Sequence, residues 1–259
     1  MRFERKQILI TVKAYPVPSK KHGESVCCAG INLENARFVR LYPVPFRDLD
    51  IEQKFRKYSI INIDCARPKD DHRPESLRVN PYTIEVIDWI SAGRAGWEKR
   101  KSMVLRLPLK SMCQVYRDEK ENNLSLGLIK PLEISFEWEK RTQSDQKERE
   151  DCYAQLGFFN KAKDVIEEIP FRFYYIFRCS EEKYCQGHKL SIIDWEIGQA
   201  YRDWRSKYQS ESTLLEKIRQ RWLEIAEIRK RDAYFYVGNM QRFREIFMVL
   251  GVFSPPKNG

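Results

Sequence analysis

The stretch SVCCAGINLENARFVRLYPV, residues 25–44, contains two short strand-like runs joined by the tripeptide LEN. Each run has the length and composition of a strand, so the stretch predicts two neighbouring strands with a tight connection. Further strand-like runs lie on either side, QILITVKAY at residues 7–15 and SIINIDCARP at residues 59–68. Short strands this close together favour a small β-barrel or sandwich.

The rest of the chain predicts a second β-rich unit, then two helices and a final hairpin. LRLPLKSM, LGLIKPLEISFEWEK and FRFYYIFRC, all between residues 105 and 179, have the character of strands. From Asp194 onward, apolar residues recur at helical spacing in two blocks, and Ser212 is placed to cap the second. DAYFYVG and EIFMVLGVF then return to strand character. We therefore expect an α+β fold with one β domain at residues 1–110 and, at residues 111–259, a second β unit with a helical C-terminal region.

The net charge of +10 is distributed unevenly along the chain. Residues 1–110 contain 22 Lys and Arg against 13 Asp and Glu, residues 111–196 contain 13 against 17, and residues 197–259 contain 12 against 7. A basic front and back around an acidic middle suggest that one face meets an anionic partner, and nucleic acid is the commonest such partner. The alternative is that the charge only keeps the protein in solution.

The sequence shows no signal for export or for membrane insertion. No apolar run reaches the roughly 18 residues that a membrane span needs, and the basic start continues as a strand-like alternation rather than as a signal peptide. We therefore expect a cytoplasmic protein without membrane contact. In that compartment most of the seven cysteines should be buried thiols rather than disulfides.

The segment RCSEEKYCQGHKLSIIDWE, residues 178–196, places Cys179, Cys185 and His188 within ten residues. Thiolate and imidazole are ligands that Zn²⁺ prefers, and a loop this short can bring three of them around one ion. A structural zinc site needs a fourth ligand, for which the sequence offers Cys152, Cys113 and Asp194. The alternatives are a Cys/His turn without metal and a catalytic cluster.

A second group of reactive side chains lies in the loop PSKKHGESVC, residues 18–27. Lys20, Lys21, Glu24 and Cys27 carry the groups that nucleophilic hydrolysis requires: Glu24 takes the thiol proton, and a lysine stabilises the anion that forms. The same lysines and glycine also suit a phosphate-binding loop. The simpler alternative is a solvated basic loop that leads to a buried Cys27.

Basic and aromatic residues follow this loop, at Arg37, Arg40, Tyr42 and Arg47, and Arg73 lies in the polar loop DDHRPES. Arginine binds phosphate, and aromatic rings stack on bases, so we predict these five residues as nucleic-acid contacts. Aromatic residues at strand spacing are also typical of a protein core, and that alternative stays open.

Two stretches, VKAYPVPSKKHGESVCCAGIN at residues 12–32 and RFVRLYPVPFR at residues 37–47, resemble the start of bacterial dual-OB-type proteins. In those proteins C-x-A-G is followed by an aromatic-x-R strand. FRC, C-x-G-H and DWE in residues 177–196, with FYVGN and FMVLGVF near the end, are similar to the rest of the same family. The resemblance covers most of the chain. It implies an OB-like small β-barrel in residues 1–110 and an association with DNA modification or defence against foreign DNA.

Some relatives in this resemblance belong to pathways that install 7-deazaguanine bases in DNA. The chemistry there includes conversion of a nitrile on the base to an amide, which would give the loop around Cys27 a substrate. The sequence departs from the family after VGN, where Met240–Gln241–Arg242–Phe243–Arg244 replaces the expected histidines. A function that depends on a terminal histidine is therefore not expected.

We expect a DNA-binding protein of a bacterial modification or defence system that works with other proteins of that system and acts on a modified base. One alternative is a hydrolase that converts the nitrile of a 7-deazaguanine base in DNA to an amide. Another is a structural subunit of a defence complex. P-loop, HExxH, PD-(D/E)xK-like and zinc-deaminase patterns are absent from the sequence, which argues against NTPase, metalloprotease, common nuclease and deaminase functions.

Overall fold

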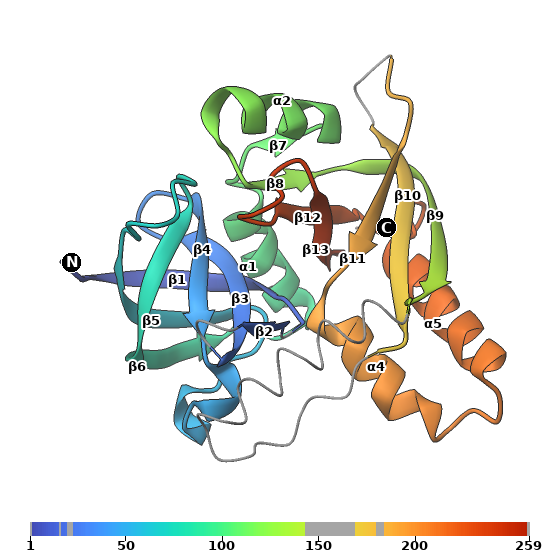
Figure 1. The fold of residues 1–259 in the computed structure, drawn as a ribbon, viewed down its shortest axis with the longest axis horizontal. Helices are drawn as coiled ribbons and strands as arrows, with labels where there is room; N and C mark the ends of the chain where they lie inside the picture. The colour runs from blue at the N-terminus through green and yellow to red at the C-terminus, as the bar shows by residue number, and fades with distance from the viewer. Residues whose placement is uncertain (1, 16, 20–22, 143–168, 180–183, 258–259) are drawn as a thin grey trace.

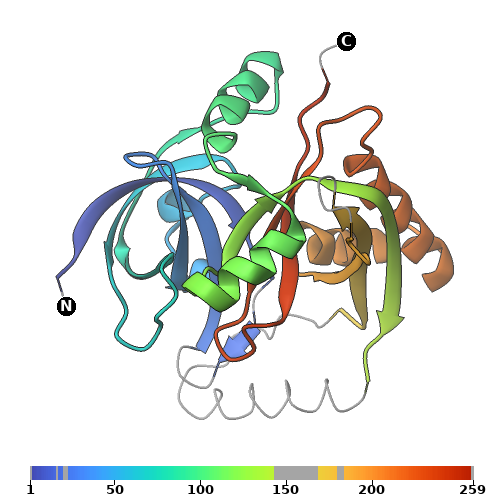
Figure 2. The same cartoon turned by 90° about the horizontal axis from the view of Figure 1, so that it is seen from above.

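The computed structural model of the protein describes residues 2–15, 17–19, 23–142, 169–179 and 184–257. It is an α+β structure made mostly of strands, in which two sheets lie side by side (Figures 1 and 2). The described part of the chain also contains four α-helices, and none of them is long and apolar enough to cross a membrane.

Five strands of the first sheet close into a barrel. They are β1 (Glu4–Lys13), β3 (Gly23–Asn32), β4 (Arg37–Val44), β5 (Ser59–Ala66) and β6 (Ser76–Trp89). The order is β1–β5–β6–β4–β3, and pairing of β1 with β3 closes the ring. All neighbours are antiparallel except β4 and β6, which run in parallel. A short strand, β2 (Val17–Ser19), extends the sheet beyond β3. The predicted small β-barrel is thus confirmed.

Alternation along the barrel strands produces two separate cores, because successive side chains point to opposite faces. On β3, Val26 and Cys28 pack inside the barrel, while Ala29 and Ile31 pack outside it. Two 3-10 turns, η1 (Phe46–Asp48) and η2 (Ile51–Gln53), lie between β4 and β5. The Phe46 ring packs edge-on against Phe55, with ring centroids 5.1 Å apart, and both rings are part of the barrel core.

The second sheet has the order β7–β8–β12–β13–β11–β10–β9. Its strands are β7 (Leu109–Lys110), β8 (Leu126–Ile129), β9 (Pro131–Lys140), β10 (Phe171–Cys179), β11 (His188–Ile192), β12 (Tyr234–Asn239) and β13 (Phe247–Phe253). Every residue of β8 and β12 is buried, as expected for central strands covered on both faces. The predicted closing hairpin is the antiparallel pair β12–β13.

The two helices predicted after Asp194 are α4 (Trp195–Arg205) and α5 (Glu211–Ile225). Asp194 caps α4, and Ser210 rather than Ser212 caps α5, because the Ser210 hydroxyl accepts the backbone N–H of Thr213. The other two helices, α1 (Arg94–Val104) and α2 (Met112–Asn122), are not predicted from the sequence. Each buries only two or three side chains, so neither shows a clear apolar stripe.

Apolar and polar contacts both join the two sheets. Leu9 and Ile31 on the barrel surface belong to the same core cluster as Leu128, Tyr236 and Phe253 of the second sheet. Buried side chains add hydrogen bonds between the barrel and the second sheet. Arg40 donates to the Ser125 carbonyl (3.0 Å), and Arg73 donates to the Asn239 carbonyl (3.0 Å). The Ser125 amide donates to the Glu75 carboxylate (2.9 Å). Since buried polar groups are costly to leave unpaired, these contacts fix one sheet against the other.

Candidate metal centre

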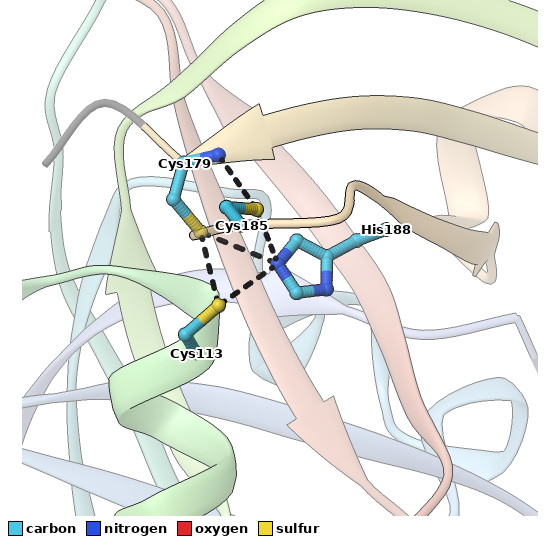
Figure 3. A group of neighbouring side chains, drawn as sticks. All are labelled: Cys113, Cys179, Cys185 and His188. Atoms are coloured by element: carbon cyan, nitrogen blue, oxygen red, sulfur yellow. Dashed lines mark hydrogen bonds between the residues drawn. The ribbon is translucent and has the colours of Figure 1, made fainter. Parts of the chain in front are cut away.

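Three cysteines and one histidine converge at one end of the second sheet (Figure 3). Cys179 ends β10, Cys185 lies in the loop that follows, His188 begins β11, and Cys113 comes from the first turn of α2. Their ligand atoms all lie within 4.8 Å of one another. The strand pair β10–β11 therefore supplies three ligands, and a helix from elsewhere in the sequence supplies the fourth.

The spacing of the four candidate ligand atoms is compatible with a tetrahedral zinc site. The Nε2 atom of His188 lies 3.3 Å from the sulfurs of Cys179 and Cys185 and 3.5 Å from that of Cys113. The sulfurs of Cys179 and Cys113 are 3.9 Å apart. With Zn–S bonds of about 2.3 Å and Zn–N bonds of about 2.0–2.1 Å, the edges of such a site measure about 3.5–3.8 Å. The four distances given above are close to these values, so the cluster could hold one metal ion at its centre.

Backbone N–H groups point at two of the sulfurs. The amide of Met112 donates to Cys179 (3.2 Å), and the amides of Cys179 and Gly187 donate to Cys185 (both 3.4 Å). Gly187 has a φ of 93°, a left-handed conformation that favours glycine and turns the chain from Cys185 to His188. These donors stabilise negative charge on sulfur, as a metal-bound thiolate requires.

The protonation states of Cys185 and His188 suit a cation, whereas burial raises the pKa of Cys179 and of Cys113. Burial acts against ionisation of Cys185, but the amides of Cys179 and Gly187 lower its pKa overall. Burial lowers the pKa of His188, which keeps the imidazole neutral and able to donate its lone pair at neutral pH. Burial, together with the neighbouring sulfur of Cys179, raises the pKa of Cys113 to about 12. That thiol would ionise when a metal displaces its proton, so metal affinity should rise with pH.

The cluster supports a closed structural site. Cys179 and Cys185 are buried, Cys113 and His188 are half-buried, and the rings of Tyr116 and Phe177 lie 6.0 and 5.5 Å from the His188 ring. Four protein ligands in tetrahedral array leave no position for a substrate, which is the pattern of structural rather than catalytic zinc.

The structure brings together all three candidate ligands predicted from the sequence and places Cys113, one of the three candidates for the fourth, beside them. Of the other candidates, Cys152 lies outside the described residues. Asp194 is buried elsewhere, where it caps α4 and accepts from Lys57 at 2.6 Å. Cys113 and Cys179 are separated by 66 residues, so no fixed spacing could have singled out Cys113 in advance.

The predicted hydrolytic loop is described only in part. Lys20 and Lys21 lie outside the described residues, as does the side chain of Glu24, whose backbone belongs to β3. Cys27 is half-buried, and its sulfur accepts from Nη1 of Arg40 at 3.4 Å. The described neighbour of Cys27 is therefore an arginine that was predicted for a different role.

The five predicted nucleic-acid contacts lie in different environments. Arg37 is exposed at the start of β4, whereas Tyr42 and Arg47 are half-buried. Arg40 and Arg73 are 4% and 6% exposed, and their guanidinium groups bond to Ser125 and to Asn239 of the second sheet. These two arginines hold the sheets together in the structure, so their contact with nucleic acid stays a prediction.

The fold and the cluster define an α+β protein with a closed β-barrel, a second mixed sheet and a candidate Cys₃His metal centre. Two family models match its sequence: Domain of unknown function (DUF8758) at residues 4–106 and Domain of unknown function (DUF8757) at residues 108–259. The second match covers more than half of the chain, so the chain belongs to the DUF8757 family. No curated protein matches the chain.

Proposed function

We propose that the chain is a DNA-binding protein of a bacterial DNA-modification or defence system, built on an OB-like barrel and stabilised by a structural zinc ion. The observation that carries the proposal is the parallel pairing of β4 with β6 in a closed five-stranded barrel. These are the third and fifth barrel strands, and parallel pairing of the third and fifth strands is a feature of the OB-fold. The two 3-10 turns lie between the third and fourth barrel strands, where OB-folds carry a helix.

The basic segment after the first barrel strand and the net charge of the chain support the same proposal. OB-folds bind oligonucleotides with the loops between strands one and two and between strands four and five. In this chain the corresponding connecting segments are residues 14–22 and 67–75. The sequence of the first contains Lys20, Lys21 and His22 and no acidic residue, whereas in the second Arg67, Lys69 and Arg73 are balanced by Asp70, Asp71 and Glu75. The net charge of +10 also suits an anionic partner. The proposed DNA binding is therefore inferred from the similarity of the barrel to the OB-fold and from the positive net charge.

The barrel rim is the surface that we assign to DNA. The second sheet covers the outer face of β1 and β3, since Leu9, Ala29 and Ile31 are buried against it. The loop 67–75 and the turn 240–246 remain at the rim, where the Gln241 side-chain amide donates to the Asp70 carbonyl and so ties them together.

Several side chains at this rim are exposed and suited to a nucleic acid. Lys69, His72, Arg242 and Phe243 are all exposed. The Arg242 guanidinium lies 5.5 Å from the centre of the Phe243 ring. A cation beside an exposed ring can hold a phosphate while an unpaired base stacks on the ring.

The first prediction is that DNA affinity depends steeply on salt. If about six phosphates are contacted, the affinity should fall by roughly 10³-fold between 50 and 200 mM salt. Fluorescence anisotropy with a labelled oligonucleotide measures this directly. Lys69→Glu and Arg242→Glu should weaken binding and flatten the salt dependence, whereas Lys207→Glu, an exposed lysine after α4, should not. The proposal would be refuted if no DNA binding were detected at low salt, or if the affinity did not change with salt concentration.

One observation favours the hydrolase as a second candidate function. Arg40 lies beside the Cys27 sulfur, and the same guanidinium bonds to the Ser125 hydroxyl, which in turn donates to Glu75 (3.0 Å). A positive charge next to the reacting sulfur can stabilise the anion that forms when the thiol attacks a nitrile. The nitrile of a 7-deazaguanine base in DNA is the substrate that we propose for this function.

The second prediction compares two adjacent cysteines. If Cys27 is the nucleophile, Cys27→Ala should abolish conversion of the nitrile and leave DNA binding nearly intact. Cys28 is fully buried in the barrel core, and burial raises its pKa, so Cys28→Ala should reduce stability and retain turnover. Mass spectrometry of nucleosides from digested substrate DNA gives the readout. Full activity in Cys27→Ala would show that Cys27 is not the nucleophile. DNA binding would then be the one proposed function that this experiment leaves in place.

A further inference from the structure

The helix α2 runs from the candidate metal centre toward the barrel rim. Cys113 lies in its first turn, and Tyr116 and Glu119 follow at intervals of three residues. Residues three apart on a helix are neighbours on its surface, so the three side chains form one row that extends about 9 Å along the helix axis. In both views α2 lies beside the end of the β12–β13 hairpin, whose turn is residues 240–246 (Figures 1 and 2).

The two later members of this row contact the hairpin. The Tyr116 ring lies 5.2 Å from the ring of Phe247, which is buried at the start of β13. A carboxylate oxygen of Glu119 lies 3.0 Å from Nε of Arg244 in the turn, and these two side chains are 14% and 30% exposed. The Arg244 carbonyl accepts from the side-chain amide of Asn239 (2.8 Å), the last residue of β12. The position of the turn therefore depends on where α2 places Tyr116 and Glu119.

A metal bond at Cys113 would contribute much of what holds α2 in place, because only three residues of this helix are buried. The ion pair at its other end is also sensitive to movement. The Nε and Nη2 atoms of Arg244 are buried and make no hydrogen bond within the described part of the chain. If Glu119 moved away, this guanidinium would keep a desolvated charge without a partner, which is costly. The turn would then rearrange to expose Arg244 to water.

We infer that the metal ion controls the turn of the β12–β13 hairpin through α2, with Glu119 as the positioning residue, and so sets the affinity for DNA. With the metal bound, Cys113 holds α2 against the sheet, Glu119 fixes Arg244, and the turn presents Arg242 and Phe243 at the rim. Without the metal, α2 and the turn separate, and these two residues lose their fixed arrangement. α2 and the turn are thus one element with two arrangements, which coupling between distant sites requires. The inference rests on the proposed DNA binding and on the proposed zinc ion.

Oligonucleotide affinity at one fixed low salt concentration tests the inference. Zinc removal with a chelator should weaken binding about five- to tenfold, near the lower end of couplings between distant sites. Glu119→Gln in zinc-loaded protein should weaken binding by a similar factor, and zinc removal from this variant should add less than about twofold, because the link is already broken. Loss of a negative charge alone would strengthen binding to DNA, so the sign of the effect separates positioning from simple electrostatics. Glu121→Gln, at an exposed glutamate of the same helix, is the matched control and should not weaken binding.

Backbone hydrogen exchange gives a readout that needs no DNA. The Ile246 amide donates to the Phe243 carbonyl (3.2 Å) within the turn. Peptides that cover residues 239–247 should therefore exchange faster after zinc removal and in Glu119→Gln, while peptides of β5 in the barrel stay protected. If zinc-loaded protein bound no DNA at low salt, the proposed function would fail, and exchange at residues 239–247 would still decide whether the metal fixes the turn. The inference would be overturned if Glu119→Gln bound DNA as tightly as the wild type, or if exchange at residues 239–247 changed in neither case.

Discussion

Protein purified without chelators is expected to contain close to one zinc ion per chain, and Cys185→Ser is expected to release it. Cys185 is buried, receives two backbone N–H groups and lies 3.3 Å from His188 Nε2, so a serine there would replace a thiolate at the centre of the cluster. Because metal binding and local folding are coupled, the loss should lower the free energy of unfolding by about 4 kcal/mol or more. Elemental analysis and thermal unfolding with and without a chelator measure both effects.

Two further variants make the zinc prediction specific. Cys65→Ser changes a buried cysteine in the barrel core, outside the cluster, and should retain the full metal content. Cys113→Ser should weaken binding if α2 supplies the fourth ligand. Cobalt substitution adds a spectroscopic test, since a tetrahedral site with three thiolates absorbs strongly in the visible range. Metal-free protein from chelator-free preparations would contradict the prediction, and full zinc in Cys113→Ser would contradict the fourth ligand.

The fold was predictable where side chains alternate or recur with a clear period. β3 and β4 follow from the two strand-like runs in residues 25–44, and α4 and α5 follow from the apolar spacing after Asp194. α1 and α2 could not be predicted because their exposed faces are highly charged and few of their residues are buried. In such helices tertiary contacts, rather than a sequence pattern, determine the structure.

The candidate site was predictable only where its residues are close in sequence. Cys179, Cys185 and His188 form a local pattern, but Cys113 joins them only through the packing of α2 against the sheet. The roles of Arg40 and Arg73 could not be predicted for the same reason. Arginines are mostly exposed, and the partners that bury these two, Ser125 and Asn239, lie 85 and 166 residues away.

Asp194→Asn is expected to destabilise the protein by about 3–5 kcal/mol, because it leaves the Lys57 ammonium buried without its closest counter-charge. The two side chains are 11% and 5% exposed and 2.6 Å apart, and they join the barrel to the start of α4. Glu196 also lies within 3.1 Å of Lys57, but its side chain is 60% exposed and gives a weaker, solvated interaction. Asparagine can still cap α4, so this variant removes the charge while it retains the helix cap.

The double variant Lys57→Met Asp194→Asn tests whether the loss comes from an unpaired charge. Removal of both charges should recover most of the stability lost in Asp194→Asn, because a buried ion pair and an apolar replacement of similar volume often differ little in free energy. Asp194→Ala should cost about 1 kcal/mol more than Asp194→Asn, since it also loses the cap. Urea unfolding of zinc-saturated protein measures all three variants. If Asp194→Asn were as stable as the wild type, or if the double variant were less stable than Asp194→Asn, the ion pair would not be what holds the barrel to α4.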